Sequence, residues 1–128
     1  MSSHPIIHVE IPASDPVSAG TFYADVFDWQ VDTSMPEYPM FKVEGGPPGA
    51  FVSLATQPPD LAIKYEVGKP LLFIATDDIN ASLASVEAHG GKVAQPLTPI
   101  PSVGAWAAFT DPTGNLIGLF TRTEHEHS

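Results

Sequence analysis

Apolar and polar side chains alternate near the start of the chain. Ile7, Val9 and Ile11 fall on one face of an extended backbone, and His8 and Glu10 fall on the other. This alternation predicts a β-strand with one apolar face and one polar face.

The next segment changes to the period of an α-helix. Asp15 and Pro16 form a typical helix start, because aspartate can cap the free N–H groups and proline fits the first helical position. Apolar residues then recur at helical spacing, at Ala19, Phe22, Tyr23, Val26 and Phe27. The pattern predicts an amphipathic helix.

Three short strands are expected after this helix, at residues 30–33, 40–43 and 51–56, separated by proline and by a glycine-rich turn. Residues 57–69 contain Pro58-Pro59 and mixed polarity, which is typical of a linker. The first half of the chain therefore reads strand, helix and three strands.

The second half repeats this order. An apolar strand is expected at 71–75, followed by a helix that Asp77-Asp78 caps and Gly90-Gly91 ends. Three more strands are expected at 92–95, 105–110 and 116–121. Such a repeat predicts an α+β domain over residues 1–128, built of two βαβββ modules at about 5–57 and 70–122, with a polar tail at 123–128.

Composition limits the partners and the compartment. Fifteen acidic residues against five basic ones give a net charge of −10, which opposes binding to nucleic acid or to an anionic membrane. No apolar run approaches the roughly 20 residues of a membrane helix, and the start of the chain does not resemble a signal peptide. The absence of cysteine excludes disulfides and thiolate chemistry. We therefore expect a cytoplasmic protein without nucleic-acid or membrane partners.

Several segments together resemble the vicinal oxygen chelate superfamily, which includes glyoxalase I, bleomycin resistance proteins and extradiol dioxygenases. In the first half they are His8-Val9-Glu10-Ile11-Pro12, Asp15-Pro16, Phe22-Tyr23 and Val26-Phe27-Asp28-Trp29. In the second half they are Asp77-Asp78-Ile79, Ala88-His89-Gly90-Gly91-Lys92-Val93 and Phe109-Thr110-Asp111-Pro112-Thr113-Gly114-Asn115. The resemblance implies two βαβββ modules whose curled mixed sheets form cups around a ligand, within one chain or across a dimer.

Metal enzymes of this superfamily draw four ligands from the first and last strands of the two modules. Matched to that pattern, the four positions here are His8, Ser53, Leu71 and Gly118, so one familiar metal ligand of four remains. Since metal sites built from nitrogen and oxygen need about three protein donors, we expect no metal and no cofactor. The chain resembles a metal-less branch of the superfamily.

The same positions supply the candidate site. His8 and Glu10 are the candidate catalytic residues, because a carboxylate in an apolar pocket has a raised pKa that suits proton transfer. Trp106 is a candidate stacking surface, although aromatic strand residues are more often core. The residues expected to contact a ligand are His8, Glu10, Ser53, Leu71, Phe73, Trp106 and Gly118.

Three functional hypotheses follow. The first is a homodimeric binding module that sequesters or carries a neutral or cationic hydrophobic compound, and the loss of donors at Leu71 and Gly118 favours it. The second is a lyase, isomerase or dioxygenase-type enzyme that uses His8 and Glu10. The third is an assembly or regulatory subunit that retains only a vestigial pocket. Fold alone does not decide among them.

Overall fold

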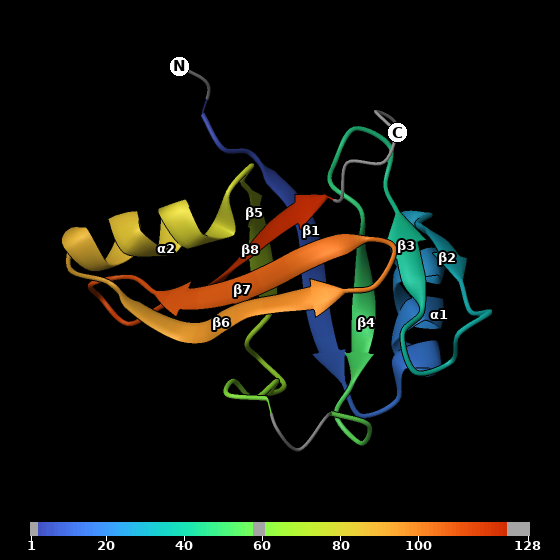
Figure 1. The fold of residues 1–128 in the computed structure, drawn as a ribbon. Coiled ribbons are helices and arrows are strands. Elements are labelled where there is room, and N and C mark those ends of the chain that lie inside the picture. Colours follow the sequence, from blue (N-terminus) through green and yellow to red (C-terminus); the bar gives the residue numbers. More distant parts are fainter. Residues whose placement is uncertain (1–2, 58–60, 123–128) are drawn as a thin grey trace. The chain divides into compact units, whose positions relative to one another are not determined.

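Each half of the chain folds as a β-strand, an α-helix and three further strands, as the sequence repeat predicts (Figure 1). A computed structural model describes residues 3–57 and 61–122, so the expected tail at 123–128 lies outside the described residues. The first half contains β1 (Ile6–Ala13), α1 (Pro16–Phe27), β2 (Gln30–Asp32), β3 (Met40–Lys42) and β4 (Gly49–Ser53). The second half contains β5 (Leu71–Ala75), α2 (Ile79–Ala88), β6 (Lys92–Ile100), β7 (Gly104–Thr110) and β8 (Leu116–Arg122). The predicted α+β class with two βαβββ modules is confirmed.

These elements form two compact units. The first unit is Ile7–Leu72, and the second joins the described residues up to Ile6 to those from Phe73 onward. The strand order is β2-β3-β4-β1 in the first unit and β5-β8-β7-β6 in the second. In each unit one strand pair is parallel (β1 with β4, β5 with β8) and the other pairs are antiparallel. Each unit therefore contains a mixed sheet. The expectation that residues 1–128 form a single domain stays a prediction.

The helices begin at the caps that the sequence indicates. The backbone N–H of Ser18 donates to the Asp15 carboxylate, with an N–O distance of 3.2 Å, and that of Ala81 donates to Asp78 at 3.0 Å. Each bond satisfies a donor that the first turn of a helix leaves unpaired. After α2, Gly90 adopts a φ of +96°, a left-handed conformation that glycine takes at little cost and that ends the helix.

Stacked aromatic rings form the core of the first unit, on the face of the sheet that α1 covers. The ring centroids of Trp29 and Phe41 are 4.5 Å apart, those of Tyr23 and Trp29 are 4.8 Å apart, and those of Tyr23 and Phe51 are 5.5 Å apart. Phe41 and Phe51 are almost fully buried. Burial of such large rings is a major source of stability in a small unit.

The second unit has an aliphatic core between α2 and its sheet. It consists of Ile79, Leu83, Ala105, Ala107 and Leu119, with Ile74, Val93 and Phe109 packed against it. In this unit β6 runs to Ile100, five residues beyond its predicted end, although it contains Pro96 and Pro99. It can do so because it is the terminal strand of the order β5-β8-β7-β6 and shifts register twice, which spares the missing N–H groups.

Among the described residues, no helix has both the length and the apolar character that crossing a membrane requires.

Candidate ligand-binding site around Glu10

Glu10 and His8 lie on the face of the first unit's sheet that α1 does not cover. In the parallel pair β1 and β4, Ile11 lies opposite Phe51 and Glu10 lies opposite Ala50. Residues opposite each other share a face, and successive residues alternate between faces. Phe51 packs against the helix side, so Ala50, Glu10 and His8 point to the other side. The alternation of residues 6–11 thus carries over into the structure.

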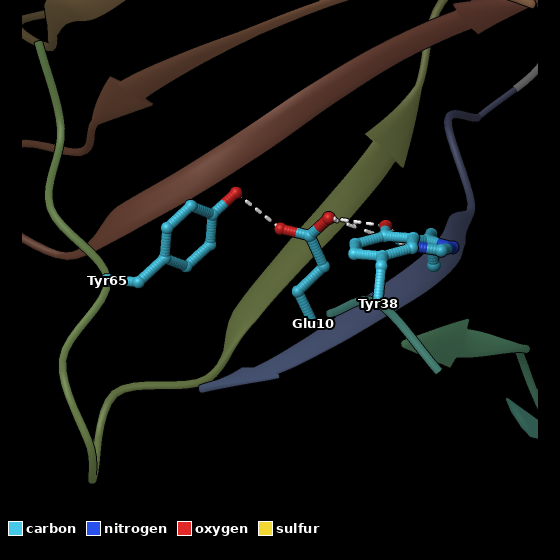
Figure 2. A network of polar contacts seen from close by, with 4 residues as sticks. Glu10, Tyr38 and Tyr65 are labelled. Atoms are coloured by element: carbon cyan, nitrogen blue, oxygen red, sulfur yellow. Dashed lines mark hydrogen bonds and ion pairs between the residues drawn. The ribbon is translucent and has the colours of Figure 1, made fainter. Parts of the chain in front are cut away.

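The carboxylate of Glu10 accepts hydrogen bonds from two tyrosines (Figure 2). The Tyr38 hydroxyl donates to Oε2 at 2.6 Å, and the Tyr65 hydroxyl donates to Oε1. His8 Nε2 lies 3.1 Å from the Tyr38 hydroxyl and 3.9 Å from Glu10 Oε2. Glu10 is only 7% exposed, so this is a nearly buried acid held between phenol groups that come from two different segments.

The two tyrosines were not found by sequence reasoning. Tyr38 lies just before β3, and Tyr65 lies in the segment between β4 and β5 that the sequence predicts to be a linker. If Glu10 of the polar pair His8 and Glu10 is buried, its carboxylate is expected to accept hydrogen bonds. The sequence carries no local signal for which residues supply them, since Tyr38 and Tyr65 are 28 and 55 positions from Glu10.

Burial controls the protonation of this group of residues. Desolvation raises the pKa of Glu10, and the hydrogen bonds from Tyr38 and Tyr65 partly oppose that rise. Desolvation lowers the pKa of His8 below its ordinary value, which favours a neutral ring at neutral pH. Burial and the nearby carboxylate raise the pKa of both tyrosines, so their hydroxyls keep their protons.

The direction of the hydrogen bond between His8 and Tyr38 follows from the bond that Tyr38 donates to Glu10. The Tyr38 hydroxyl donates its hydrogen bond to the carboxylate of Glu10, so the hydroxyl oxygen accepts from His8. His8 Nε2 then carries the proton. A metal needs a lone pair on the nitrogen that binds it, so in this arrangement Nε2 is committed to Tyr38.

Ser53 was expected beside His8 and Glu10, and the register corrects this placement. Ser53 lies opposite Ala13 and is two residues from Phe51, which puts it on the face that α1 covers. Its Oγ accepts a hydrogen bond from the backbone N–H of Ala55 at 3.2 Å. The pairing of β4 with β1 does not by itself put Ser53 beside His8 and Glu10, because the register decides on which face a side chain lies.

Three predicted residues of the second unit do come together. Phe73 lies opposite Gly118 in the β5–β8 pair, and its ring is 6.3 Å from that of Trp106, edge-on. A Cβ added to Gly118 would lie 2.5 Å from the Phe73 ring. The space next to Gly118 is therefore occupied by the Phe73 ring. Leu71, which is also among the residues expected to contact a ligand, is 2% exposed.

The residues present do not fit the metal that the superfamily resemblance implies. Leu71 and Gly118 have no donor atom, and the Ser53 hydroxyl bonds its own chain segment. The part of the chain that the structure describes contains no group of three or more His, Asp or Glu side chains able to hold a metal ion. Glu10 and His8 instead bond tyrosine hydroxyls.

Thermal unfolding is therefore expected to be independent of divalent metal. Because folding free energy is linked to metal binding only where a site exists, melting curves recorded with and without excess EDTA should have the same midpoint. The same measurement after adding zinc or manganese is the control. A midpoint that falls by several degrees with EDTA and recovers with one added metal contradicts the prediction.

Comparison with known proteins agrees with the fold. The model of the Glyoxalase/Bleomycin resistance protein/Dioxygenase superfamily matches residues 6–119. "Putative glyoxylase CFP32" of Mycobacterium bovis is 30% identical over 125 residues, which cover 91% of this chain and 45% of that protein. The chain thus spans about half the length of this relative.

Two solved structures share the fold at low sequence identity. A hypothetical protein from Bacillus halodurans has a TM-score of 0.71 at 11% identity, covering 97% of this chain and 98% of its own. A methylmalonyl-CoA epimerase of Streptomyces coelicolor has a TM-score of 0.67 at 18% identity, covering 96% and 100%. Taken with the family match, these findings show that the chain belongs to the glyoxalase/bleomycin resistance protein/dioxygenase superfamily.

Proposed function

We propose that this protein binds a small neutral or cationic hydrophobic molecule, without a metal, through the carboxylate of Glu10. The observation that carries the proposal is the nearly buried Glu10 held by the hydroxyls of Tyr38 and Tyr65. Keeping an ionisable acid out of water costs free energy that an apolar residue would not cost. An acid that is buried at such a cost, on the sheet face that α1 does not cover, supports a role in recognition.

The chemistry of the site indicates which ligands to expect. An ionised carboxylate only accepts hydrogen bonds, so its natural partner is a hydroxyl, an N–H group or an ammonium. The net charge of −10 adds a long-range preference for neutral or cationic molecules over anions. The assignment of Ser53, Leu71, Phe73, Trp106 and Gly118 as ligand contacts stays a prediction.

A set of three small aromatic probes tests this proposal. Benzylamine, benzyl alcohol and benzoate share a ring and differ in charge. In NMR titrations at neutral pH we expect benzylamine to bind with an affinity of about 1 mM, roughly −4 kcal/mol, and benzyl alcohol more weakly. The amide signals of residues 8–10 should shift in both titrations, and benzoate should leave them in place.

Matched variants give the controls. Glu10→Gln should weaken benzylamine binding about tenfold, because a charge-assisted hydrogen bond is lost. Glu66→Gln changes an exposed glutamate that pairs with Lys69, both in the linker of residues 57–69, and it should have no effect on benzylamine binding. Equal binding of benzoate, or an unchanged affinity in Glu10→Gln, would show that Glu10 does not recognise the ligand.

The raised pKa of Glu10 also supports a second function, a lyase, isomerase or dioxygenase-type enzyme that uses His8 and Glu10. A carboxyl group that titrates closer to neutral pH is suited to take and return a proton. One similar solved structure is a methylmalonyl-CoA epimerase. An enzyme that moves a proton on carbon would catalyse deuterium uptake from heavy water into a carbon-acid substrate, and binding alone would not.

A cytoplasmic homodimer is part of the same proposal. Phe22 and Phe27 of α1 are 56% and 58% exposed, and Val26 between them is 54% exposed. A cluster of apolar side chains of this kind is typical of a surface that another protein covers. A second copy is the simplest partner, since most soluble oligomers are homodimers.

A further inference from the structure

The two tyrosines that bond Glu10 are attached to the protein in different ways. Tyr38 lies between residues that are tied to β4: the N–H of Phe51 donates to the Pro39 carbonyl at 2.9 Å, and the N–H of Ser53 donates to the Glu37 carbonyl at 3.3 Å. Its hydroxyl is therefore held by the same sheet that carries Glu10. Moving Tyr38 would require breaking backbone bonds of that sheet.

Tyr65 is held by a side chain instead. Its backbone N–H donates to Oε1 of Gln57 at 2.9 Å, and its backbone carbonyl accepts from Nε2 of the same side chain at 3.2 Å. Nε2 also lies 3.4 Å from the Leu54 carbonyl, just after β4. The Gln57 amide thus pairs with the backbone of Tyr65 as a neighbouring strand would, and it links the linker to the end of β4.

The surroundings of Tyr65 show that this arrangement is built into the fold. Ile63, two residues earlier, is only 6% exposed, so this part of the linker is anchored by an apolar side chain as well. A long linker normally keeps its polar backbone groups in water. Here one glutamine satisfies both backbone groups of the residue that reaches Glu10.

We propose that Gln57 is a positioning residue that holds the Tyr65 hydroxyl on Oε1 of Glu10. A ligand then enters at Oε1 by displacing Tyr65, while Tyr38 stays on Oε2. The part of this proposal that concerns the ligand rests on the proposed function. The part that concerns Gln57 and Tyr65 rests on the hydrogen bonds alone. The backbone of Tyr65 is held by one glutamine side chain, whereas the residues on either side of Tyr38 are bonded to β4.

The titratable groups around Glu10 define what an experiment must separate. His8 comes from β1, Tyr38 from the segment before β3, and Tyr65 from the linker. Lys42 of β3 is exposed and lies on the same sheet face, two residues from the partner of Ala50. Gln57 is not titratable and bonds the backbone of Tyr65, so removing its amide should act on Glu10 through Tyr65.

A double-mutant cycle without any ligand tests the positioning role. The side-chain carboxyl of Glu10 is titrated by carbon-13 NMR in the wild type, Gln57→Ala, Tyr65→Phe and the double variant. Each single variant should raise the pKa of Glu10, because a hydrogen bond to the charged form is weakened or lost. The double variant should match Tyr65→Phe, since Gln57 acts only through the Tyr65 hydroxyl.

Two further variants make the cycle decisive. Gln57→Met keeps the side-chain volume and removes the hydrogen bonds of the amide to Tyr65 and Leu54, so it should reproduce the shift of Gln57→Ala if packing is not the cause. Gln95→Ala removes a buried glutamine of the second unit and should leave the titration of Glu10 unchanged. Additive shifts in the double variant, or an unchanged pKa in both Gln57 variants, overturn the assignment of Gln57.

Benzylamine then tests the side of entry. Tyr65→Phe should bind it about fivefold more tightly, because the ligand no longer competes with an internal donor worth about 1 kcal/mol, and Tyr38→Phe should show no gain. A gain in Tyr38→Phe with none in Tyr65→Phe overturns entry at Oε1. If benzylamine binds no variant, the proposed function fails with the side of entry, while the ligand-free cycle still decides the role of Gln57.

Discussion

Replacing Gly49 with alanine is expected to remove a large part of the stability of the protein. A Cβ at Gly49 would lie 2.0 Å from the carbonyl oxygen of Val9 and 2.4 Å from Cζ of Phe41. The first contact is with the backbone of β1, so relief requires β1 and β4 to move apart and lose the parallel pairing that carries Glu10. We expect a loss of at least about 3 kcal/mol, against the 5–15 kcal/mol typical of a whole domain.

The measurement is chemical and thermal unfolding, and Gly46 in the turn before β4 offers a matched control. A loss of this size should lower the melting temperature by about 10 °C or more. In Gly46→Ala the new Cβ would lie 3.8 Å from its nearest neighbour, the side chain of Val43, so that variant should melt close to the wild type. Equal melting temperatures for the two variants would contradict the close approach of β1 and β4.

Replacing Glu10 with alanine is expected to be the second large effect. The hydroxyls of Tyr38 and Tyr65 both donate to this carboxylate, and both rings are partly buried. Without the acceptor each hydroxyl loses a hydrogen bond at about 1–3 kcal/mol. The removal of a desolvated charge offsets part of this cost, so we expect a net loss of about 2–4 kcal/mol in the free energy of unfolding near neutral pH.

Glu10→Gln should differ from the wild type in a pH-dependent way. Burial raises the folded-state pKa of Glu10 above its ordinary 4.5, so the folded protein binds this proton more tightly than the unfolded chain does. The contribution of Glu10 to stability is therefore complete below about pH 4.5 and falls as the pH rises through the folded-state pKa. Glutamine does not titrate, so the variant should gain stability relative to the wild type as the pH rises.

Unfolding in urea from about pH 4 to pH 8 measures the difference in free energy of unfolding between Glu10→Gln and the wild type. This difference should rise with pH by at most about 1.4 kcal/mol per pH unit. His8 titrates in the opposite sense, because burial lowers its pKa and acid then favours unfolding. It is present in both proteins and largely cancels in their difference. If the free energy of unfolding of Glu10→Gln minus that of the wild type stays constant or falls as the pH rises, Glu10 is not desolvated in the folded protein.

The fold could be predicted because its signals are local. Asp15 and Asp78 cap the helices through residues three positions away, and the strand of residues 6–11 shows its two faces in its own alternation. The repeated order of elements then indicated two βαβββ modules. Where the prediction failed locally, at the end of β6, register shifts allowed a terminal strand to accommodate Pro96 and Pro99.

The candidate site could be predicted only in part. The alternation placed His8 and Glu10 together, and the family pattern showed that Leu71 and Gly118 cannot bind a metal. The register of β1 on β4, which moves Ser53 to the helix side, depends on the packing of Phe51 against α1. A register is set by contacts between segments, and a shift of one residue reverses every side chain.

By itself, the sequence determined the two modules, the helix caps and the presence of one acid and one histidine on a strand face. Only the tertiary structure decided that Tyr38 and Tyr65 bond Glu10 and that the Gln57 amide pairs with Tyr65. The physical reason is range. Backbone conformation and capping depend on neighbours within a few positions, whereas the partners of a buried carboxylate depend on which distant segments the folded chain brings to it.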